Sequence, residues 1–409
     1  MDILEAWLSN SVPSCRLKVK KEFVIVIYPA NTTLPTPRAN TIQILNTARE
    51  LAAQGTDVHL VARKAHANPE EILAYYGIAP HENLHFHLVP APLIKLAKAH
   101  ESMVLKKTWQ LLRKHTGEKI LFTRDHLFAS LLLKMRKLMK FKLVYEAHTL
   151  FSVTAKETYM PIAWNEQKEK RIQKREKYIF ENADGIVYIS SSLKKFVAQY
   201  FDVKLPSEVI HDGTHVAQTL RPRPSNLICY SGQFYLWKGV ATLMESLRWI
   251  DHAKLQMFGG GYSTVHDDMR EMQKIIDQYQ LASKLEFRGF LPPSEIARAI
   301  SDCSIGVLPL PNNVIGNHCN SPLKLFDYMA NGLTVVASDL LTVRELIEHG
   351  KNGHLVEPGN ARSLAEGINA VLNNQTYRQS LAQSAFETVK SYSWQKRGER
   401  LNTFLASLR

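Results

Sequence analysis

Apolar residues in this chain fall into short continuous runs, separated by segments with helical spacing. The run "EFVIVIYPA" (Glu22–Ala30) predicts a buried strand, and "TIQILNTARELAAQG" (Thr41–Gly55) predicts an amphipathic helix closed by glycine. "DVHLVAR" (Asp57–Arg63) predicts the next strand, and four further apolar runs follow, ending at "GIVYIS". Because strands that alternate with helices form parallel sheets, the pattern favours an α/β fold.

A proline-rich stretch, "RPRPSN" (Arg221–Asn226), interrupts this alternation and predicts a linker. The alternation restarts at "LICYSG", continues through "AKLQMFGGG", "KLEFRGF", "SIGVLPL" and "LTVVAS", and ends in a C-terminal amphipathic helix. We therefore expect two successive α/β domains with a cleft between them. Open α/β sheets bind ligands beyond the carboxyl ends of their strands, so the loops after the strands should line this cleft.

The composition agrees with a two-domain globular protein. The 409 residues suit two domains of about 200 residues each, and 45% hydrophobic with 22% charged residues support a sizeable core. The N-terminus lacks the basic region of a secretory signal, and no apolar run approaches the roughly 18 residues of a membrane span. Four distant cysteines form neither a metal-spaced pair nor a disulfide framework. We expect a cytoplasmic protein.

The formal net charge of +13 predicts an anionic partner. Basic residues gather in "RLKVKK" (Arg16–Lys21), "KMRKLMKFK" (Lys134–Lys142) and "KEKRIQKREK" (Lys168–Lys177). The third run contains acids and is typical of a solvated helix face. The second alternates with Leu and Met, as in a helix lying on an anionic membrane surface, although a plain surface helix is the alternative. No recognition helix or aromatic ladder accompanies these charges, so we expect no nucleic-acid partner.

The stretch "NSPLKLFDYMANGL" predicts a helix that could hold a nucleotide. Ser321 is a good N-cap, and Pro322 suits the first helical position. Lys324 falls in the first turn, where free N–H groups bind phosphate. Asp327 follows one turn later, where a carboxylate can accept hydrogen bonds from the two hydroxyls of a cis-diol. Phosphate beside diol indicates a nucleoside diphosphate. The alternative is an ordinary surface helix with a Lys324–Asp327 ion pair.

Two glycine loops follow predicted strands. In "YSGQFYLWKGV" the strand ends near Gly232, and Lys238 precedes the next helix, where a lysine can reach a phosphate oxygen. In "FGGGYS", Gly259 and Gly260 allow a ligand to approach the backbone closely. Both patterns are also typical of simple tight turns.

Three histidines are candidates for chemistry. His85 and His87 in "HENLHFHL" share one strand face, a spacing compatible with a metal. Because no third ligand can be identified from the sequence, we interpret them as polar strand positions and expect no metal site. His148 in "YEAH" ends a strand that faces the cleft, and is a catalytic candidate with a purely structural role as the alternative.

The ordered set of motifs resembles the retaining glycosyltransferases of family 4, which have the GT-B fold. The C-terminal half carries "SGQFYLWKGVATLMESL", "FGGG", "LEFRGFLPPSEIARAISDCSIGVLPL", "SPLKLFDYMANGLTVVASDL", "VRELIEHGKNGHLVEPGN" and "YSWQKRGERL" in the order and spacing of that family. The N-terminal half is similar more loosely, through "PRANTIQILNTARELAAQGTDVHLVA", "YEAHTLF" and "HDGTH". Single motifs are weak signals, but their ordered set is specific.

The resemblance implies an α/β, GT-B architecture in which two Rossmann-like domains face a central cleft. Residues 1–217 would form an acceptor-side domain, completed by the C-terminal helix 391–409, and residues 218–390 would bind the nucleotide sugar. His148 and Lys238 would be catalytic, and Arg38 and Asn40 would face the acceptor or the phosphates. The implied donor-binding residues are Gly232, Gln233, Lys238, Gly259, Gly260, Arg288, Gly289, Phe290, Leu291, Cys319, Ser321, Pro322, Leu323, Lys324 and Asp327.

Two positions depart from the family pattern. Gln233 stands where the family has an arginine, and Cys319 stands where it has the first acid of a paired motif, so that only Asp327 is left. The implied reaction moves a sugar from a UDP- or GDP-sugar to a glycan, lipid-linked or small-molecule acceptor. It would retain the anomeric configuration and need no metal or other cofactor. An epimerase of the same architecture, or an inactive relative, is the alternative.

Overall fold

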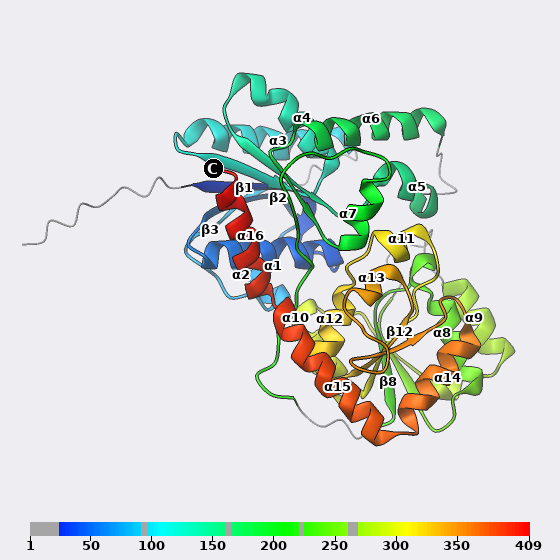
Figure 1. Cartoon of the computed structure of the whole chain (residues 1–409). Coiled ribbons are helices and arrows are strands. Elements are labelled where there is room, and N and C mark those ends of the chain that lie inside the picture. Colours follow the sequence, from blue (N-terminus) through cyan, green and yellow to red (C-terminus); the bar gives the residue numbers. More distant parts are fainter. Residues whose placement is uncertain (1–23, 91–96, 160–164, 221–224, 261–268) are drawn as a thin grey trace, which may run out of the picture.

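The computed structural model describes residues 24–90, 97–159, 165–220, 225–260 and 269–409. Two parallel sheets, each with helices on both faces, form two adjacent bodies (Figure 1). This arrangement confirms the predicted α/β architecture of two Rossmann-like domains. The basic run at residues 16–21 lies outside the described residues.

The first sheet has seven strands among the described residues, in the order β3-β2-β1-β4-β5-β6-β7. Its strands are β1 (Ile25–Leu34), β2 (Asp57–Lys64), β3 (Leu84–Pro90), β4 (Lys119–Thr123), β5 (Lys142–Ala147), β6 (Gly185–Tyr188) and β7 (Ser207–Val209). Its helices are α1 (Ala39–Ala53), α2 (Pro69–Tyr76), α3 (Ala97–Lys114), α4 (His126–Met135), α5 (Phe151–Tyr159), α6 (Glu166–Asn182) and α7 (Ser191–Val197).

The second sheet has six strands in the described part of the chain, in the order β10-β9-β8-β11-β12-β13. Its strands are β8 (Leu227–Gln233), β9 (Lys254–Gly260), β10 (Leu285–Gly289), β11 (Ile305–Leu308), β12 (Thr334–Ser338) and β13 (His354–Val356). Its helices are α8 (Val240–Ser246), α9 (Met269–Gln278), α10 (Pro293–Ala299), α11 (Val314–His318), α12 (Leu323–Ala330), α13 (Leu341–Arg344), α14 (Ala361–Leu372) and α15 (Gln375–Val389).

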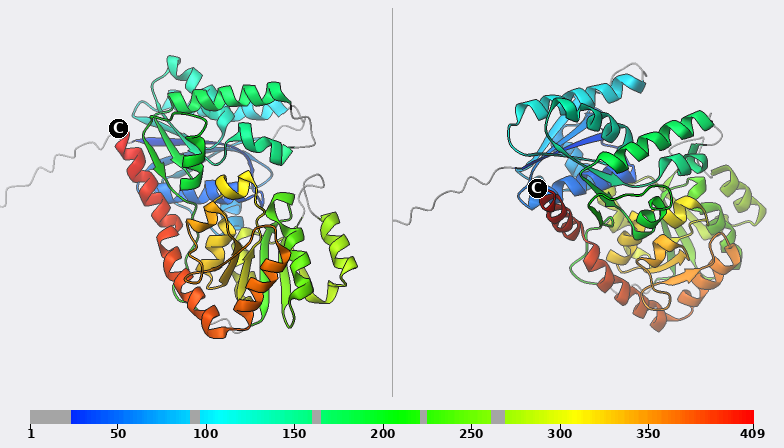
Figure 2. Two further views of the ribbon diagram at one scale, coloured as in Figure 1. Left: turned by 45° about the vertical axis from the view of Figure 1, so that its right-hand side comes forward. Right: turned by 45° about the horizontal axis from the view of Figure 1, so that its top comes forward.

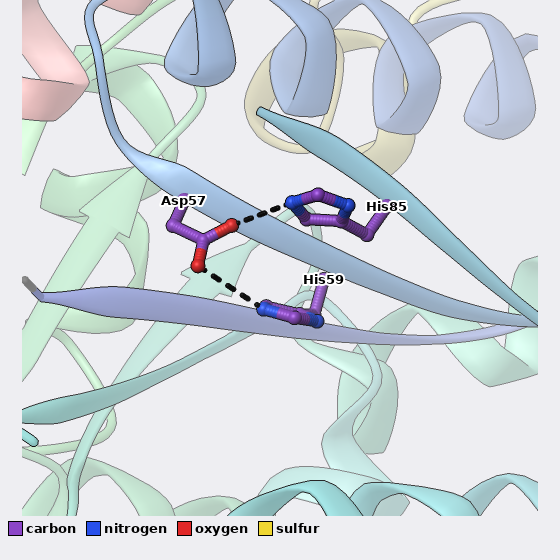
Figure 3. Close-up of side chains that lie close together, drawn as sticks. All are labelled: Asp57, His59 and His85. Carbon is purple, nitrogen blue, oxygen red and sulfur yellow. Dashed lines mark ion pairs between the residues drawn. The ribbon is translucent and has the colours of Figure 1, made fainter. Parts of the chain in front are cut away.

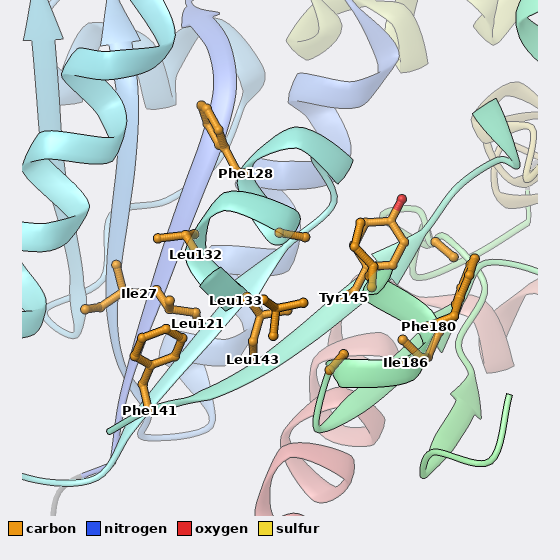
Figure 4. Packing of buried hydrophobic residues seen from close by; sticks show 14 of the residues in the cluster. Ile27, Leu121, Phe128, Leu132, Leu133, Phe141, Leu143, Tyr145, Phe180 and Ile186 are labelled. Atoms are coloured by element: carbon orange, nitrogen blue, oxygen red, sulfur yellow. The ribbon is translucent and has the colours of Figure 1, made fainter. Parts of the chain in front are cut away.

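The central strands of the first sheet, β1, β4, β5 and β6, contain apolar runs because both of their faces are buried. Successive residues of β1 point to opposite faces, so Ile25 and Ile27 belong to one hydrophobic cluster while Val26 and Tyr28 belong to the other. Figure 4 shows the first cluster, in which residues from β1, β4 and β5 pack under α4 and α6.

The last helix, α16 (Trp394–Ser407), leaves the second body and packs along α1 of the first (Figures 1 and 2). The close approach depends on Gly398, since a Cβ there would lie 2.6 Å from the Cβ of Glu50. The chain therefore crosses between the two bodies twice, before β8 and again before α16.

The basic run at residues 134–142 does not form the one continuous helix that was predicted, either on a membrane surface or as a plain surface helix. Helix α4 ends at Met135, a short 3-10 turn (Arg136–Leu138) follows, and β5 begins at Lys142. Arg136 pairs with Asp184, and Lys142 lies 3.2 Å from Glu118, so two of the five basic residues are engaged within the fold. The expectation of a single amphipathic helix is therefore wrong. Among the described residues, no helix is both long and apolar enough to cross a membrane.

Candidate functional site

A cavity of about 780 Å³ lies between the two bodies, at the carboxyl ends of their strands. Its described lining includes the start of α1 and the segment after β5 from one side, and the ends of β8 and β9 with the start of α12 from the other. The predicted site residues that line it are Arg38, Asn40, Gly232, Gln233, Lys238, Gly259, Phe290, Leu291, Cys319, Leu323, Lys324 and Asp327. Those that do not are His148, Gly260, Arg288, Gly289, Ser321 and Pro322.

Two lysines converge on the cavity. Lys238 ends a 3-10 turn (Leu236–Lys238), and Lys324 lies in the first turn of α12 with its Nζ 3.7 Å from the ring centroid of Tyr230. Burial lowers the pKa of Lys238 to about 8. Burial, and then the charge of Lys238, lower the pKa of Lys324 well below its ordinary value. No carboxylate of the described residues is among the causes of either shift, and the lining holds three basic side chains, those of Arg38, Lys238 and Lys324, against the one carboxylate of Asp327.

The start of α12 lies one residue later than predicted. Pro322 is the N-cap and Leu323 the first helical residue, so the assignment of Ser321 as N-cap is wrong. The hydroxyl of Ser321 instead accepts a hydrogen bond from the backbone N–H of Asp212, at 3.1 Å. That contact ties the start of α12 to the segment that follows the first sheet.

Asp327 lies one turn after Lys324 and faces the same cavity. Its Oδ1 accepts a hydrogen bond from the Thr214 hydroxyl at 2.7 Å, so the alternative of a Lys324–Asp327 ion pair is wrong. Burial raises the pKa of Asp327 to about 6, against the effect of the Thr214 hydrogen bond. It is the one carboxylate in the described lining of the cavity.

Glycines bring backbone and side chains together at the ends of β8 and β9. A Cβ on Gly232 would lie 2.9 Å from the Nζ of Lys324, and a Cβ on Gly259 would lie 2.0 Å from the carbonyl oxygen of Gly232. Both glycines have positive φ, at 137° and 129°. A side chain at either position would push the amine or the neighbouring strand away.

The loop after β10 is only partly in the cavity. Phe290 and Leu291 line it, whereas Arg288 lies on the exposed strand and pairs with Glu286 at 3.2 Å. The uncharged Gln233 lines the cavity where the related family has arginine, and its Oε1 is buried without a hydrogen-bond partner in the described part of the chain.

His148 follows β5, and the carboxylate of Glu146 lies next to its imidazole. Its Nε2 lies 3.0 Å from Glu146 Oε2, and Glu146 pairs in turn with Arg397 of α16. Burial alone would raise the pKa of Glu146, but Arg397 and His148 hold it below its ordinary value. Burial lowers the pKa of His148. The imidazole itself is not in the cavity lining, although the next residue, Thr149, is.

Several lining residues were not predicted. Tyr235 and Trp237 stack with ring centroids 4.6 Å apart, and Phe151 adds a third aromatic ring from α5. The signal was present in the sequence, because Tyr235 and Trp237 lie in the loop directly before Lys238.

The carboxylate of Glu345, in the second body, accepts hydrogen bonds from the first body. Glu345 accepts hydrogen bonds from the backbone N–H groups of Ser191 and Ser192, at 2.8 and 2.6 Å, and lies 2.8 Å from His211 Nε2. Although burial opposes it, these hydrogen bonds lower the pKa of Glu345 to about 2. The contact joins α7 of the first body to the residue that follows α13 of the second.

Family models match both bodies. The model described as "Glycosyltransferase Family 4" matches residues 41–218, and that described as "Glycosyl transferases group 1" matches residues 213–388. The fold and the cleft have the GT-B architecture. The chain belongs to the group 1 and family 4 glycosyltransferases, which confirms the resemblance seen in the sequence.

Two curated relatives match different shares of the chain. An uncharacterized glycosyltransferase of Methanocaldococcus jannaschii, MJ1178, is 26% identical over 223 residues, which make up 54% of this chain and 58% of the relative. The chain thus spans less than two thirds of that relative. A D-inositol 3-phosphate glycosyltransferase of Corynebacterium diphtheriae is 21% identical over 398 residues, covering 88% of both chains.

Solved structures share the whole fold. A sucrose-phosphate synthase from Thermosynechococcus elongatus has a TM-score of 0.75 at 20% identity, covering 94% of this chain and 98% of the other. Anabaena Alr3699/HepE, solved in complex with UDP-glucose, has a TM-score of 0.71 at 16% identity, covering 93% and 99%. At these identities the likeness establishes the fold.

Proposed function

We propose that this glycosyltransferase uses a nucleoside-diphosphate sugar and holds its diphosphate between Lys238 and Lys324. The observation that carries the proposal is the pair of half-buried amines that face one cavity without a carboxylate partner among the described residues. A diphosphate would supply the missing negative charge. The complex of the structural neighbour HepE with UDP-glucose is consistent with a donor of this kind.

The rest of the cavity suits the nucleoside and the leaving group. Asp327 can accept hydrogen bonds from ribose hydroxyls, and Phe290 with Leu291 offers an apolar surface for a uracil or guanine base. The first turn of α1 contains no acidic residue and enters the cavity at Arg38, so its N–H groups can face phosphate oxygens. The amide of Gln233 can donate a neutral hydrogen bond where relatives use a charge.

We further propose transfer of a hexose with retention of configuration. Inversion needs a general base opposite the leaving group. Asp327 lies on the donor side, Glu146 is fully buried against Arg397, and Asp125 caps α4 and accepts a hydrogen bond from Asn31. With these carboxylates engaged, the departing diphosphate can take the acceptor proton on the same face. Its stabilisation by two lysines then becomes the main catalytic task, and it needs no divalent metal.

His148 has a positioning role in this scheme. Glu146 Oε2 lies 3.0 Å from the imidazole Nε2, and His148 lies one residue before the cavity-lining Thr149. We propose that it contacts the transferred sugar. The acceptor would be a glycan, a lipid-linked sugar or a small polyol; for a lipid-linked acceptor, the exposed Lys134, Lys137 and Lys140 would favour anionic membranes.

A ligand series tests the donor proposal. Titration calorimetry with UDP, GDP and the matching monophosphates should show a clear preference for one diphosphate, since only it spans both lysines. Donor sugars are then incubated with and without acceptor. Transfer only with acceptor supports the proposal, whereas an altered sugar without acceptor would indicate an epimerase. Equal affinity for monophosphate and diphosphate would contradict the assigned phosphate site.

A further inference from the structure

A cluster of imidazoles and one carboxylate lies near the amino ends of β2 and β3, whereas the cavity lies at the carboxyl ends of the sheet. Figure 3 shows three side chains of this cluster. Asp57 opens β2, His59 follows two residues later, and His85 lies directly across on β3. The Nε2 of His85 is 2.8 Å from Asp57 Oδ1, and the Nε2 of His59 is 3.5 Å from Asp57 Oδ2. One ligand atom from each residue lies within 4.8 Å of the others.

Two further histidines surround this trio. The Nε2 of His87 is 2.9 Å from the Nδ1 of His59, and the His87 and His59 rings stack with centroids 5.1 Å apart. His115, just after α3, meets His59 edge-on with centroids 4.6 Å apart. Helix α3 covers this face of the sheet, so His59 is buried.

Ion pairs between Asp57 and the two histidines satisfy only part of the cluster. Asp57 Oδ1, His59 Nε2 and His115 Nε2 are buried and make no hydrogen bond of good geometry within the described residues. Leaving such atoms unpaired is costly, and each specific case in a native protein calls for an explanation. A cation held by Asp57, His59 and His85 would satisfy the Asp57 oxygen and the His59 nitrogen together.

We propose that Asp57, His59 and His85 form a site for a divalent first-row transition metal, with Zn²⁺ as the best match. Imidazole nitrogens with one carboxylate suit Zn²⁺ and its neighbours, whereas Mg²⁺ and Ca²⁺ prefer oxygen ligands. Tetrahedral bonds of about 2.0–2.1 Å place ligand atoms about 3.3 Å apart. Each imidazole lies near this spacing from one carboxylate oxygen, at 2.8 Å for His85 and Oδ1 and 3.5 Å for His59 and Oδ2, and the three ligand atoms lie within 4.8 Å of one another.

The surroundings match what a metal-bound imidazole needs. If His59 binds through Nε2, its Nδ1–H can donate to His87, which would fix the ring and its tautomer. The sequence indicated only His85 and His87; the ligands it could not supply, Asp57 and His59, come from the neighbouring strand.

The position of the site assigns it a structural role. Asp57 and His85 lie at the amino ends of β2 and β3, whereas the cavity lies at the carboxyl ends of the same sheet. A metal there would clamp the edge strand β3 to β2, and would take no part in sugar transfer. The proposal is therefore independent of the donor site.

Cobalt titration tests the site directly. The untagged full-length chain is treated with EDTA, desalted and titrated with Co²⁺, whose visible absorption reports tetrahedral coordination. We expect one equivalent to bind and Zn²⁺ to displace it. Zn²⁺ at about 100 times its Kd should raise the melting temperature by several degrees.

Variants separate this site from adventitious binding. His85→Ala changes a half-exposed edge position and should weaken Co²⁺ binding at least tenfold, while His66→Ala, an exposed histidine elsewhere in the same domain, should bind as the wild type does. Asp57→Asn provides a second ligand variant should His85→Ala fail to fold, as judged by circular dichroism in EDTA. Absence of tetrahedral bands in the wild type, or unchanged affinity in a folded ligand variant, would overturn the proposal in favour of a metal-free hydrogen-bonded cluster.

Discussion

Replacing Lys324 by methionine should weaken donor binding and also stabilise the donor-free protein. The amine is half-buried against Tyr230, close to Lys238, and without a carboxylate partner in the described chain. Its charge therefore has a cost in the free protein that is offset only when an anion enters. Methionine keeps the length and the apolar stem but removes the charge.

The two effects have opposite signs and measurable sizes. A hydrogen bond to a charged group contributes about 1.5–3 kcal/mol, so Kd for the nucleotide should rise roughly 10- to 150-fold. Relief of the unpaired charge should stabilise the free protein by about 1 kcal/mol, as is common when an active-site charge is removed. That corresponds to a rise in melting temperature of roughly 2–4 °C for domains of this size.

Calorimetry for Kd and thermal unfolding without ligand measure both quantities on the same samples. Lys254→Met is the matched control, because that lysine is exposed at the start of β9 and should change neither quantity. A Kd within threefold of the wild type would show that Lys324 does not contact the donor. A lower melting temperature would show that the amine is stabilised in the free protein, against the reasoning above.

Four further predictions concern the cleft and the contact between the two bodies. For the donor, kcat/KM should fall below pH 6, as Asp327 takes up a proton, and above pH 8, as Lys238 loses its charge. Because the unfolded chain keeps the Lys238 proton up to about pH 10.5, stability should rise over that same upper window. Glu345→Gln should weaken the contact between the bodies, lowering the melting temperature and raising KM for the donor, with X-ray scattering to detect opening. NMR of the product should show a retained anomer, and EDTA should leave transfer intact while circular dichroism shows a folded chain; inversion, or loss of activity in folded EDTA-treated protein, would refute the mechanism.

Much of the fold could be predicted because its physical cause is local. Strands such as β1 are buried on both faces, and a continuous apolar run is the direct record of that burial. Boundaries were less certain: the prediction stopped this strand at Ala30, whereas β1 runs to Leu34. At α12 a serine before proline looked like a cap, but the Ser321 hydroxyl is used by Asp212, 109 residues away in sequence.

Individual residues of the site could be predicted where a local motif indicates them. Lys238, Lys324 and Asp327 follow strand ends, and topology brings strand ends together at one edge. The partners that define their chemistry are distant in sequence. Asp327 accepts its hydrogen bond from Thr214, and in the histidine cluster His85 of β3 meets Asp57 and His59 of β2. No periodicity reports such contacts, because they depend on how separate elements pack.

The support of His148 shows how a distant helix becomes part of the site. Breaking a buried ion pair such as Arg397–Glu146 leaves an unpaired charge and costs about 3–5 kcal/mol. The Arg397 side chain must therefore be positioned accurately against Glu146. The neighbouring Gly398 allows this positioning. Because glycine has no side chain, α16 can lie directly against Glu50 of α1 at this residue. That close approach carries Arg397 into the core beneath β5. The adjacent arginine and glycine of "QKRGER" thus act together: the glycine sets the depth of the helix, and the arginine fixes the carboxylate that orients the histidine.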